Sequence, residues 1–367
     1  IAQNLTSFSN ALQDIFGRKN MHFLTRALHT VIGTPLLPQN MPKSNEKRLF
    51  SNMQNQNPNG EVVYFTSCLN RIFAPKTPKD LERVFDFAKS LDRPLQEVFE
   101  SLCKKAKFDL YYPKNIQNLC CGKAYKNHKN EGKELAKKAY FALKEASQNG
   151  KIPIVCDHSA CSLEMLKQIK DFEEQEKLAK RDFEAINPLR FYDLPAFVNE
   201  HLLPHLEIVP YSACIQNQCE TNTKKDNEKV AIYAPCGSRN LSVKSYKWEE
   251  SMFSLANACG AEIAQDLQVK CCGFAGNKGF ITPSLNESAL KYFGANYLKD
   301  FAQDFSRDCD DLYSGCASTS PQNCQKDSIF SGVNIGFSSS STCEIGFSKK
   351  SGFEWRHIIY LVDICAK

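Results

Sequence analysis

The sequence predicts an α/β protein with two homologous domains, each a small, mainly parallel sheet flanked by helices. Short apolar runs of strand type alternate with amphipathic helical stretches, which is typical of βαβ units. This layout occurs twice, and each copy contains a Cys-Cys-Gly triplet, at residues 120–122 and 271–273. A chain of 367 residues is long enough to bury two separate cores.

Residues 1–60 are expected to form a helical segment and a linker that precede the first domain. The stretch SNALQDIFGRKNMHFLTRALHTVIG has apolar residues at helical spacing, and a polar, Pro/Asn-rich linker follows it from about residue 35. A helix packed on the next domain is the first interpretation. A helix lying on a membrane surface is the alternative that this pattern allows.

The first domain is expected over residues 61–206. Its strands are EVVYFTSC, which ends at Cys68, then FDLYYP, and then KIPIVCD, which ends near Cys156. The helices between them are DLERVFDFAKSLDRPLQEVFESLCKKA and KELAKKAYFALKEASQ, which carry apolar residues at helical spacing.

A polar linker over residues 207–228 separates this domain from the second, which is expected over residues 229–367. The strand KVAIYAPC ends at Cys236, and the helix WEESMFSLANACG ends at Gly260. AEIAQDLQVK leads to the second triplet, SLNESALKYFGANYLKDFAQDF is expected to be a helix, and EWRHIIYLVDICA closes the chain. The Ser-, Asp- and Asn-rich stretch over about residues 309–337 has no partner in the first domain and is expected to be an inserted loop.

Composition excludes several classes of protein. The formal net charge of +5 is modest and spread along the chain, so no nucleic-acid partner is expected. No apolar run approaches the roughly 20 residues that a membrane-spanning helix needs. The 17 cysteines are an odd number in a long chain without a signal peptide, which favours reduced, metal-binding thiols in the cytoplasm over a disulfide framework.

The cysteines that follow predicted strands are the candidate metal ligands. Cys68, Cys156 and Cys236 each follow a strand, and the triplets lie just beyond others, so the carboxyl edge of each parallel sheet should collect them. Thiolates bind soft metals and iron–sulfur clusters. About five cysteines per site exceed the four of a tetrahedral zinc, which favours iron–sulfur chemistry, although structural zinc–thiolate sites stay open. Gly122 and Gly273 are expected to let the backbone approach such a cluster.

Other candidate residues have competing interpretations. Cys103, Cys259 and Cys365 lie on amphipathic helices and are expected to be small buried hydrophobes. His158 either tunes a cluster by hydrogen bonding or simply begins a helix. Arg239 either donates to a cluster sulfur, holds a substrate anion, or forms a surface salt bridge.

The order of these motifs resembles a known family. The pattern of cysteine, long spacer, Cys-Cys-Gly and further cysteine, given twice, resembles the cysteine-rich CCG domain that heterodisulfide reductases share with glycolate oxidase iron–sulfur proteins. The segments VVYFTSCLNRIF, NLCCGKAY, IPIVCDHSACS, VAIYAPCGSRNL, CCGFAGNKGF and SSSSTCEIGFS, in this order, look like the carboxy-terminal half of bacterial FAD- and iron–sulfur-containing D-lactate dehydrogenases. This resemblance covers nearly the whole chain from Val62 to Asp363.

The resemblance implies two iron–sulfur clusters of the [4Fe-4S] type and a ligand set for each. The first site would use five cysteines and the second four: Cys68, Cys120, Cys121, Cys156 and Cys161, then Cys236, Cys271, Cys272 and Cys343. Within the second repeat, Cys309-Asp310 echoes Cys156-Asp157 and Cys316 echoes Cys161, so Cys309 and Cys316 compete with Cys343 for the last position. Cys343 is preferred, because its segment STCEIG looks most like the last ligand motif of the family.

The resemblance also implies partners. A flavin domain carrying FAD and a ferredoxin-like module precede this region in the family, and electrons pass from it to a quinone or cytochrome. The chain is therefore expected in the cytoplasm, with peripheral contact at the inner face of the cytoplasmic membrane allowed, and is not expected to oxidise D-lactate by itself. A heterodisulfide-reductase-like thiol–disulfide oxidoreductase is the alternative enzyme.

Overall fold

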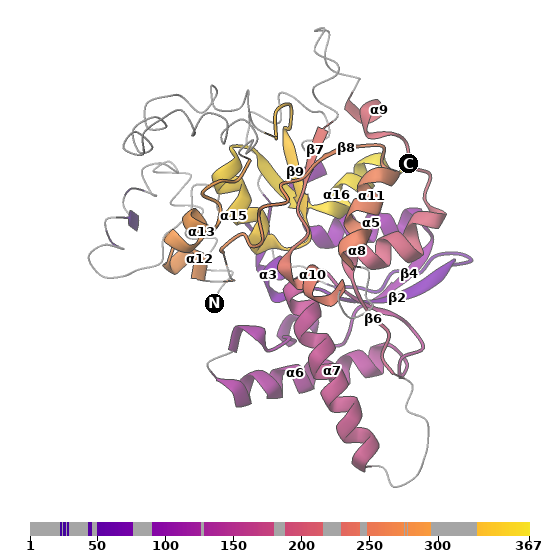
Figure 1. Ribbon diagram of the computed structural model, residues 1–367. Coiled ribbons are helices and arrows are strands. Elements are labelled where there is room, and N and C mark those ends of the chain that lie inside the picture. The colour runs from indigo at the N-terminus through magenta and orange to yellow at the C-terminus, as the bar shows by residue number, and fades with distance from the viewer. Residues whose placement is uncertain are drawn as a thin grey trace, which may run out of the picture.

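The computed structural model describes residues 23, 25, 26, 28, 43–45, 50–75, 90–125, 128–179, 188–215, 229–242, 248–274, 276, 278–294 and 329–367 (Figure 1). Most of the expected amino-terminal helix lies outside these residues. Cys219, Cys309, Cys316 and Cys324 also lie outside them.

The first half contains a four-stranded sheet in which every neighbouring pair is parallel, in the order β4-β2-β5-β6. Its strands are β2 (Gly60–Phe65), β4 (Phe108–Tyr111), β5 (Ile154–Cys156) and β6 (Phe191–Asp193). Its main helices are α5 (Leu95–Lys105), α6 (Lys129–Ala146), α7 (Ser159–Ala179) and α8 (Leu194–Phe197). The last four residues of β2 are buried, as expected for a strand with helices on both faces of its sheet.

The second half repeats this topology. Its parallel sheet has the order β10-β9-β7-β8, so in both sheets the first strand lies between the second and the third, and the fourth is at an edge. The strands are β7 (Lys229–Ile232), β8 (Glu262–Ala264), β9 (Ile335–Ser338) and β10 (Glu354–His357). The helices α11 (Trp248–Ala258), α15 (Ser341–Ser351) and α16 (Ile358–Cys365) take the places of α5, α7 and α8. The expected fold class of parallel sheets flanked by helices is confirmed.

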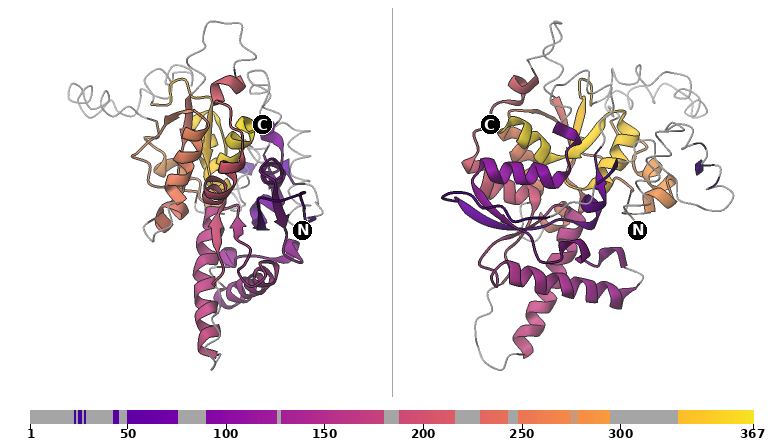
Figure 2. Two further views of the ribbon diagram at one scale, coloured as in Figure 1. Left: turned by 90° about the vertical axis from the view of Figure 1, so that its right-hand side faces the viewer. Right: turned by 180° about the vertical axis from the view of Figure 1, so that it is seen from behind.

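Short elements complete the described chain. They are β1 (Lys43–Ser44), α3 (Cys68–Ile72), β3 (Phe73–Ala74), α9 (Tyr211–Ile215), α10 (Cys236–Ser242), α12 (Lys278–Ile281) and α13 (Ser284–Ala289). Single turns of other helix types occur at η2 (Ile116–Asn118), η3 (Lys123–Tyr125), η4 (Val198–Leu202) and η5 (Leu203–His205). Figure 2 shows α6 and the long helix α7 extending away from the two sheets at one end of the molecule.

The two halves pack together by exchanging equivalent contacts. Helix α16 of the second half packs on α5 of the first half. The equivalent helix of the first half, α8, packs on α11 of the second half in the same way. One continuous apolar core therefore includes strands of both sheets. At the α16–α5 contact, the largely buried Asp363 accepts a hydrogen bond of 2.8 Å from Ser101 and pairs with Lys105 at 3.3 Å.

Four expected boundaries are wrong. The helix expected from residue 284 to residue 305 ends at Ala289, and turns follow up to Gly294. The expected inserted loop ends before residue 335, because Ile335–Ser338 is the strand β9. Its four residues include a glycine and a serine and precede a run of serines, so the apolar pattern of a strand is weak. The strands expected to end at Cys68 and Cys236 end at residues 65 and 232, and each cysteine begins a short helix.

No helix in the described part of the chain is both long and apolar enough to span a lipid bilayer.

Replacing Gly336 in β9 by alanine should destabilise the second half. A Cβ atom there would overlap the indole ring of Trp355 on β10, which is buried. We expect Gly336→Ala to lower the free energy of unfolding by about 1–3 kcal/mol, the cost of overpacking a core, measured by denaturant unfolding. In a double-mutant cycle, Trp355→Leu should reduce this cost, and an unchanged cost would contradict the contact.

Candidate metal centres

Five cysteines of the first half gather beyond the carboxyl end of its sheet. Cys68 begins α3, Cys156 ends β5, and Cys161 is the third residue of α7. The thiols of Cys120 and Cys121, in the loop after η2, complete a chain of hydrogen bonds that runs from Cys68 through both of them to Cys161. Cys156 is fully buried and close enough to Cys161 for their charges to interact. The first expected ligand set is thus brought together.

Four cysteines of the second half form an equivalent group. Cys236 begins α10 and is hydrogen-bonded to Cys271, in the loop that follows β8. Cys272 follows in the same loop, and its Sγ lies 3.2 Å from the Sγ of Cys343, which is the third residue of α15. The second expected ligand set, including the preferred Cys343, is also brought together.

The repeated topology shows which cysteines correspond. Cys343 has the position in α15 that Cys161 has in α7, since each is the third residue of its helix. Cys343, and not Cys316, is therefore the counterpart of Cys161. The residue that corresponds to Cys156 is Ser338, since each ends the third strand of its sheet. Ser338 is fully buried, and its hydroxyl has no hydrogen-bond partner among the described residues. The first group therefore has five sulfur donors, whereas the second has four and a buried hydroxyl.

In the first triplet, the leading cysteine is the thiolate. Hydrogen bonds from Cys121 and Cys68 lower the pKa of Cys120 to about 3, against the opposing effect of burial. The backbone N–H of Gly122 also donates to this sulfur, at 3.4 Å. Since a thiolate is the form that binds metals, Cys120 is ready to act as a ligand.

The second triplet repeats this arrangement. Hydrogen bonds from Cys236 and Cys272 lower the pKa of Cys271 to about 2. The backbone N–H of Gly273 donates to its sulfur at 3.3 Å. The same donors thus stabilise the same charge in both halves.

An arginine three residues after the helix-starting cysteine holds each triplet loop. Arg71 donates a hydrogen bond to the carbonyl oxygen of Leu119, and Arg239 donates to that of Lys270, in each case the residue before the triplet. Arg239 also donates to the Tyr233 hydroxyl, at 2.8 Å. Each arginine also helps to lower the pKa of the first thiol of its triplet. Arg71 is not among the residues expected from the sequence, although the repeated spacing Cys-x-x-Arg indicates it.

The triplet glycines are required by the protein backbone rather than by a cluster. Gly122 has φ +80°, and a Cβ atom on it would overlap the carbonyl oxygen of Gly132 in α6. Gly273 has φ +69°, and its Cβ would overlap the carbonyl oxygen of Leu285 in α13. The expectation that these glycines make room for a cluster is therefore corrected: they let a helix backbone contact the loop.

A buried carboxylate fixes the loop that carries Cys68. Asp157 accepts hydrogen bonds from the Tyr64 hydroxyl at 2.8 Å, from the Thr66 hydroxyl at 2.8 Å and from the backbone N–H of Ser67 at 2.7 Å. These bonds join the end of β2 to the end of β5. Cys68 and its neighbours after β5 are thereby held at a fixed separation.

His158 lies between the two sulfur groups. Its Nε2 is 3.3 Å from the hydroxyl of Ser340, its counterpart in the second half. Burial lowers the pKa of His158. Cys161 and, more weakly, Cys343 raise this pKa by more than burial lowers it, so the net shift is upward. His158 therefore interacts with both groups instead of only starting a helix.

The remaining described cysteines are remote from both groups. Cys103, Cys259 and Cys365 are buried, as expected of small hydrophobes. The sequence did not indicate that Cys365 lies in hydrogen-bond contact with both Cys259 and Cys214.

The sulfur groups have the donor chemistry of an iron–sulfur site but are packed as hydrogen-bonded thiols. Among the described residues, no three His, Cys, Asp or Glu side chains surround one point as ligands of a metal ion. The 3.2 Å between Cys272 and Cys343 is shorter than the roughly 3.8 Å between two thiolates on a tetrahedral zinc with 2.3 Å bonds. Binding a metal would therefore require the thiols to lose their protons and move apart.

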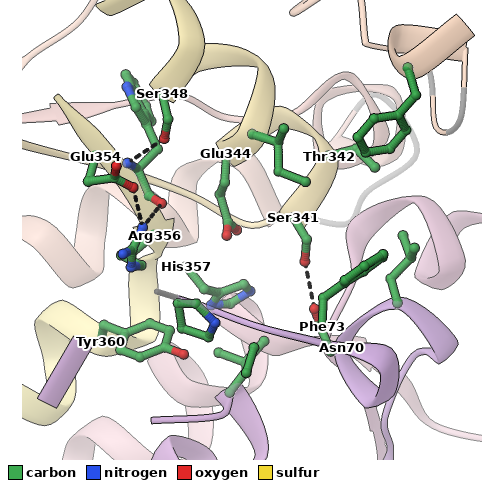
Figure 3. Close-up of a pocket in the computed structure, with 17 residues that line it drawn as sticks. Asn70, Phe73, Ser341, Thr342, Glu344, Ser348, Glu354, Arg356, His357 and Tyr360 are labelled. Atoms are coloured by element: carbon green, nitrogen blue, oxygen red, sulfur yellow. Dashed lines mark hydrogen bonds and ion pairs between the residues drawn. The ribbon is translucent and has the colours of Figure 1, made fainter. Parts of the chain in front are cut away.

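A cavity of about 80 Å³, with a largely apolar wall that carries several polar groups, adjoins the second group (Figure 3). It lies between α3 of the first half and α15, β10 and α16 of the second. Ser341, Thr342 and Glu344, which flank Cys343 in α15, line it, as does the buried His357 at the end of β10.

A scan against models of known protein families finds no match to this chain, and a search of curated proteins finds none either.

Replacing Gly122 by alanine should be more harmful than replacing a glycine that has the same backbone conformation but open surroundings. Gly352 has φ +79°, and a Cβ atom on it would have nothing within 4 Å, so Gly352→Ala reports left-handed strain alone, about 1 kcal/mol. Gly122→Ala adds the overlap with Gly132 and should cost roughly 1–3 kcal/mol more in denaturant unfolding. Equal costs would show that the loop does not need this close approach.

Acid should destabilise the fold through His357. Burial lowers the pKa of His357 to about 3, whereas an unfolded histidine titrates near its ordinary 6.5. Stability from the neutral imidazole is thus complete above about pH 6.5 and is lost as the pH falls toward 3, by about 1.4 kcal/mol per pH unit. His357→Gln should flatten the dependence of the unfolding free energy on pH in this range, and His205→Gln, at an exposed site, should not. Parallel pH profiles for wild type and His357→Gln would contradict the assignment.

Proposed function

We propose that this chain is the iron–sulfur electron-transfer region of a flavin-dependent D-lactate (2-hydroxy acid) dehydrogenase. It relays electrons from FAD, held by upstream flavin and ferredoxin-like domains, towards a quinone or cytochrome. The observation that carries this proposal is the duplicated sulfur group: two equivalent sets of cysteines, each with a thiolate stabilised by the same donors. Duplicated sulfur groups beside one another suit a chain of redox centres better than a single hydrolytic or group-transfer site.

The family resemblance implies each ligand set, and the position of these cysteines beyond the strand ends supports it. Cys68, Cys120, Cys121, Cys156 and Cys161 would hold the first cluster. Cys236, Cys271, Cys272 and Cys343 would hold the second. A bound iron–sulfur cluster accepts and releases one electron at a time.

The surrounding protein would set the properties of these centres. Arg71 and Arg239 hold the triplet loops and bring positive charge near the sulfurs, which favours the reduced, more negative state of a centre. The difference between Cys156 and Ser338 should give the two centres different ligands and therefore different potentials. His158, between the groups, contacts the second half through Ser340.

The proposed location follows from the acceptor. Electron delivery to a membrane quinone requires peripheral contact with the inner face of the cytoplasmic membrane, and a cytochrome acceptor requires a docking surface near one centre. Substrate oxidation belongs to the flavin domain in this proposal. The chain alone should not oxidise D-lactate.

A thiol–disulfide oxidoreductase is the second candidate function. It is favoured by the thiol pairs themselves, because a thiolate at Cys271 hydrogen-bonded to neighbouring thiols is the reactive form in thiol–disulfide exchange. Structural zinc sites are the third, since four cysteines in the second group equal the ligand number of zinc.

Iron and sulfide analysis of anaerobically prepared protein, with absorption and EPR spectra, tests the proposal. We expect broad absorption that bleaches on reduction, and about half of the iron lost in Cys120→Ser, because only the first centre loses a ligand. Cys271→Ser should remove the other half. The matched control is Cys103→Ala, which changes a buried cysteine outside both groups and should retain all iron.

Colourless protein with about two zinc ions would instead support structural zinc sites. Protein without bound metal that reduces a small disulfide, and loses this activity in Cys271→Ser, would support the oxidoreductase.

A further inference from the structure

The two halves present equivalent polar positions where they meet, and these positions carry different residues. The last residue of the fourth strand is Asp193 in the first half and His357 in the second. The fourth residue of the helix that follows the third strand is Ser162 in α7 and Glu344 in α15. Two residues after the helix-starting cysteine, the first half has Asn70 and the second Ser238.

Around Asp193 the polar groups satisfy one another. Ser162 donates a hydrogen bond to Oδ1 of Asp193 at 2.8 Å, and Ser238 donates to Oδ2 at 3.2 Å. Both serines and the carboxylate are fully buried. Both carboxylate oxygens of Asp193 therefore have a partner within the protein.

Around His357 the equivalent groups do not satisfy one another. Nδ1 of His357 accepts the backbone N–H of Ile359 at 3.4 Å, so the proton of the neutral ring is on Nε2. His357 is 1% exposed, and its Nε2 has no hydrogen-bond partner among the described residues. Oε1 of Glu344 is likewise buried without such a partner. Because buried polar groups are normally paired, these two groups leave a hydrogen-bond donor and an acceptor available to a molecule in this space.

The cavity lies at this same place. Glu344 and His357 point toward the space shown in Figure 3. Its 80 Å³ would hold about five to eight waters at 10–15 Å³ each, enough for one ring-sized molecule. Apolar side chains form much of the remaining wall: Leu69, Phe73, Leu95, Phe280, Ile345 and Trp355. The cavity therefore fits a ring with a polar atom at its edge.

The charges in the wall select a neutral ligand. Glu354 and Arg356 form a buried ion pair at 2.8 Å, and the same Arg356 nitrogen donates to the carbonyl oxygen of Trp355 at 3.0 Å. Arg356 is therefore paired, and the wall contains no other arginine or lysine. A carboxylate or phosphate would find no unpaired cation here, whereas a carbonyl oxygen would accept the Nε2–H of His357.

We propose that this cavity binds the headgroup of a quinone, with a carbonyl oxygen accepting from His357 Nε2 and with Glu344 beside the ring. Such a ring is neutral, flat and of the right size, and its oxygens are hydrogen-bond acceptors. Glu344 is adjacent in sequence to Cys343, so the ring would lie next to the second sulfur group. The role of the quinone as electron acceptor rests on the proposed function, but its binding does not.

Binding of duroquinone to the full chain tests this site. All four ring carbons that thiols attack are methylated, so the cysteines should not be alkylated. Trp355 lines the cavity, and the variant Trp248→Phe leaves it as the single tryptophan, because the chain has two. We expect duroquinone to quench Trp355 fluorescence saturably in this variant. Durene, the same methylated ring without oxygens, should bind more weakly.

Two substitutions separate the site from general hydrophobic binding. Ala74→Phe fills the cavity from β3 and should abolish saturable quenching. Glu344→Gln and His357→Gln should each weaken binding about two- to tenfold, the effect of altering one neutral hydrogen bond. The control is Ala146→Phe, at the end of α6, which should bind as well as the parent. Circular dichroism and thermal melting establish that each variant is folded.

Absence of saturable quenching in the parent, or equal affinity in folded Ala74→Phe, would show that the cavity does not bind a quinone. Equal affinity for duroquinone and durene would show that the polar groups do not recognise the ring oxygens. Quinone binding by protein without iron would contradict the proposed function alone, and iron–sulfur protein without quinone binding would contradict this site alone.

Discussion

The carboxyl ends of two parallel sheets meet at one seam, and the rest of the molecule depends on this constraint. Strands that run in parallel place the loops after them on one side. In this chain the loop after β5 bonds the loop after β9, through the N–H of Ser159 and the carbonyl oxygen of Ser339 at 3.2 Å. Asn70 in α3 accepts from Ser341 in α15 at 2.6 Å. Both sulfur groups and the cavity therefore lie close to this seam.

The same solution is used twice to hold a thiolate near other thiols. Burial alone raises the pKa of a thiol, so a buried thiolate needs donors. Each half provides them with neighbouring thiols, with the glycine N–H of the triplet and with an arginine that also fixes the loop. Each glycine adopts positive φ against the backbone of a following helix. Such agreement in detail is strong physical support for two equivalent sites.

The two halves carry different residues at several equivalent buried positions. Ser338 in place of Cys156 removes one sulfur without changing the strand. His357 and Glu344 in place of Asp193 and Ser162 replace a closed hydrogen-bonded group by unpaired groups beside a cavity. A duplicated scaffold thus presents one side that is internally satisfied and one that is open to a ligand.

The sequence by itself determined the class of fold, because apolar strand runs such as that of β2 and the helical spacing of α5 and α6 are local patterns. The family resemblance named the cysteines of both groups but left Cys309 and Cys316 as competitors of Cys343, because the strand before Cys343 has a weak pattern. Only the tertiary structure decided that Cys343 matches Cys161 and that Cys156 has no cysteine counterpart. It also decided that the triplet glycines face helix backbone and that His357 and Glu344 share a cavity. These outcomes depend on contacts between segments far apart in the chain, such as β9, whose four residues are fixed by packing against Trp355 rather than by their own pattern.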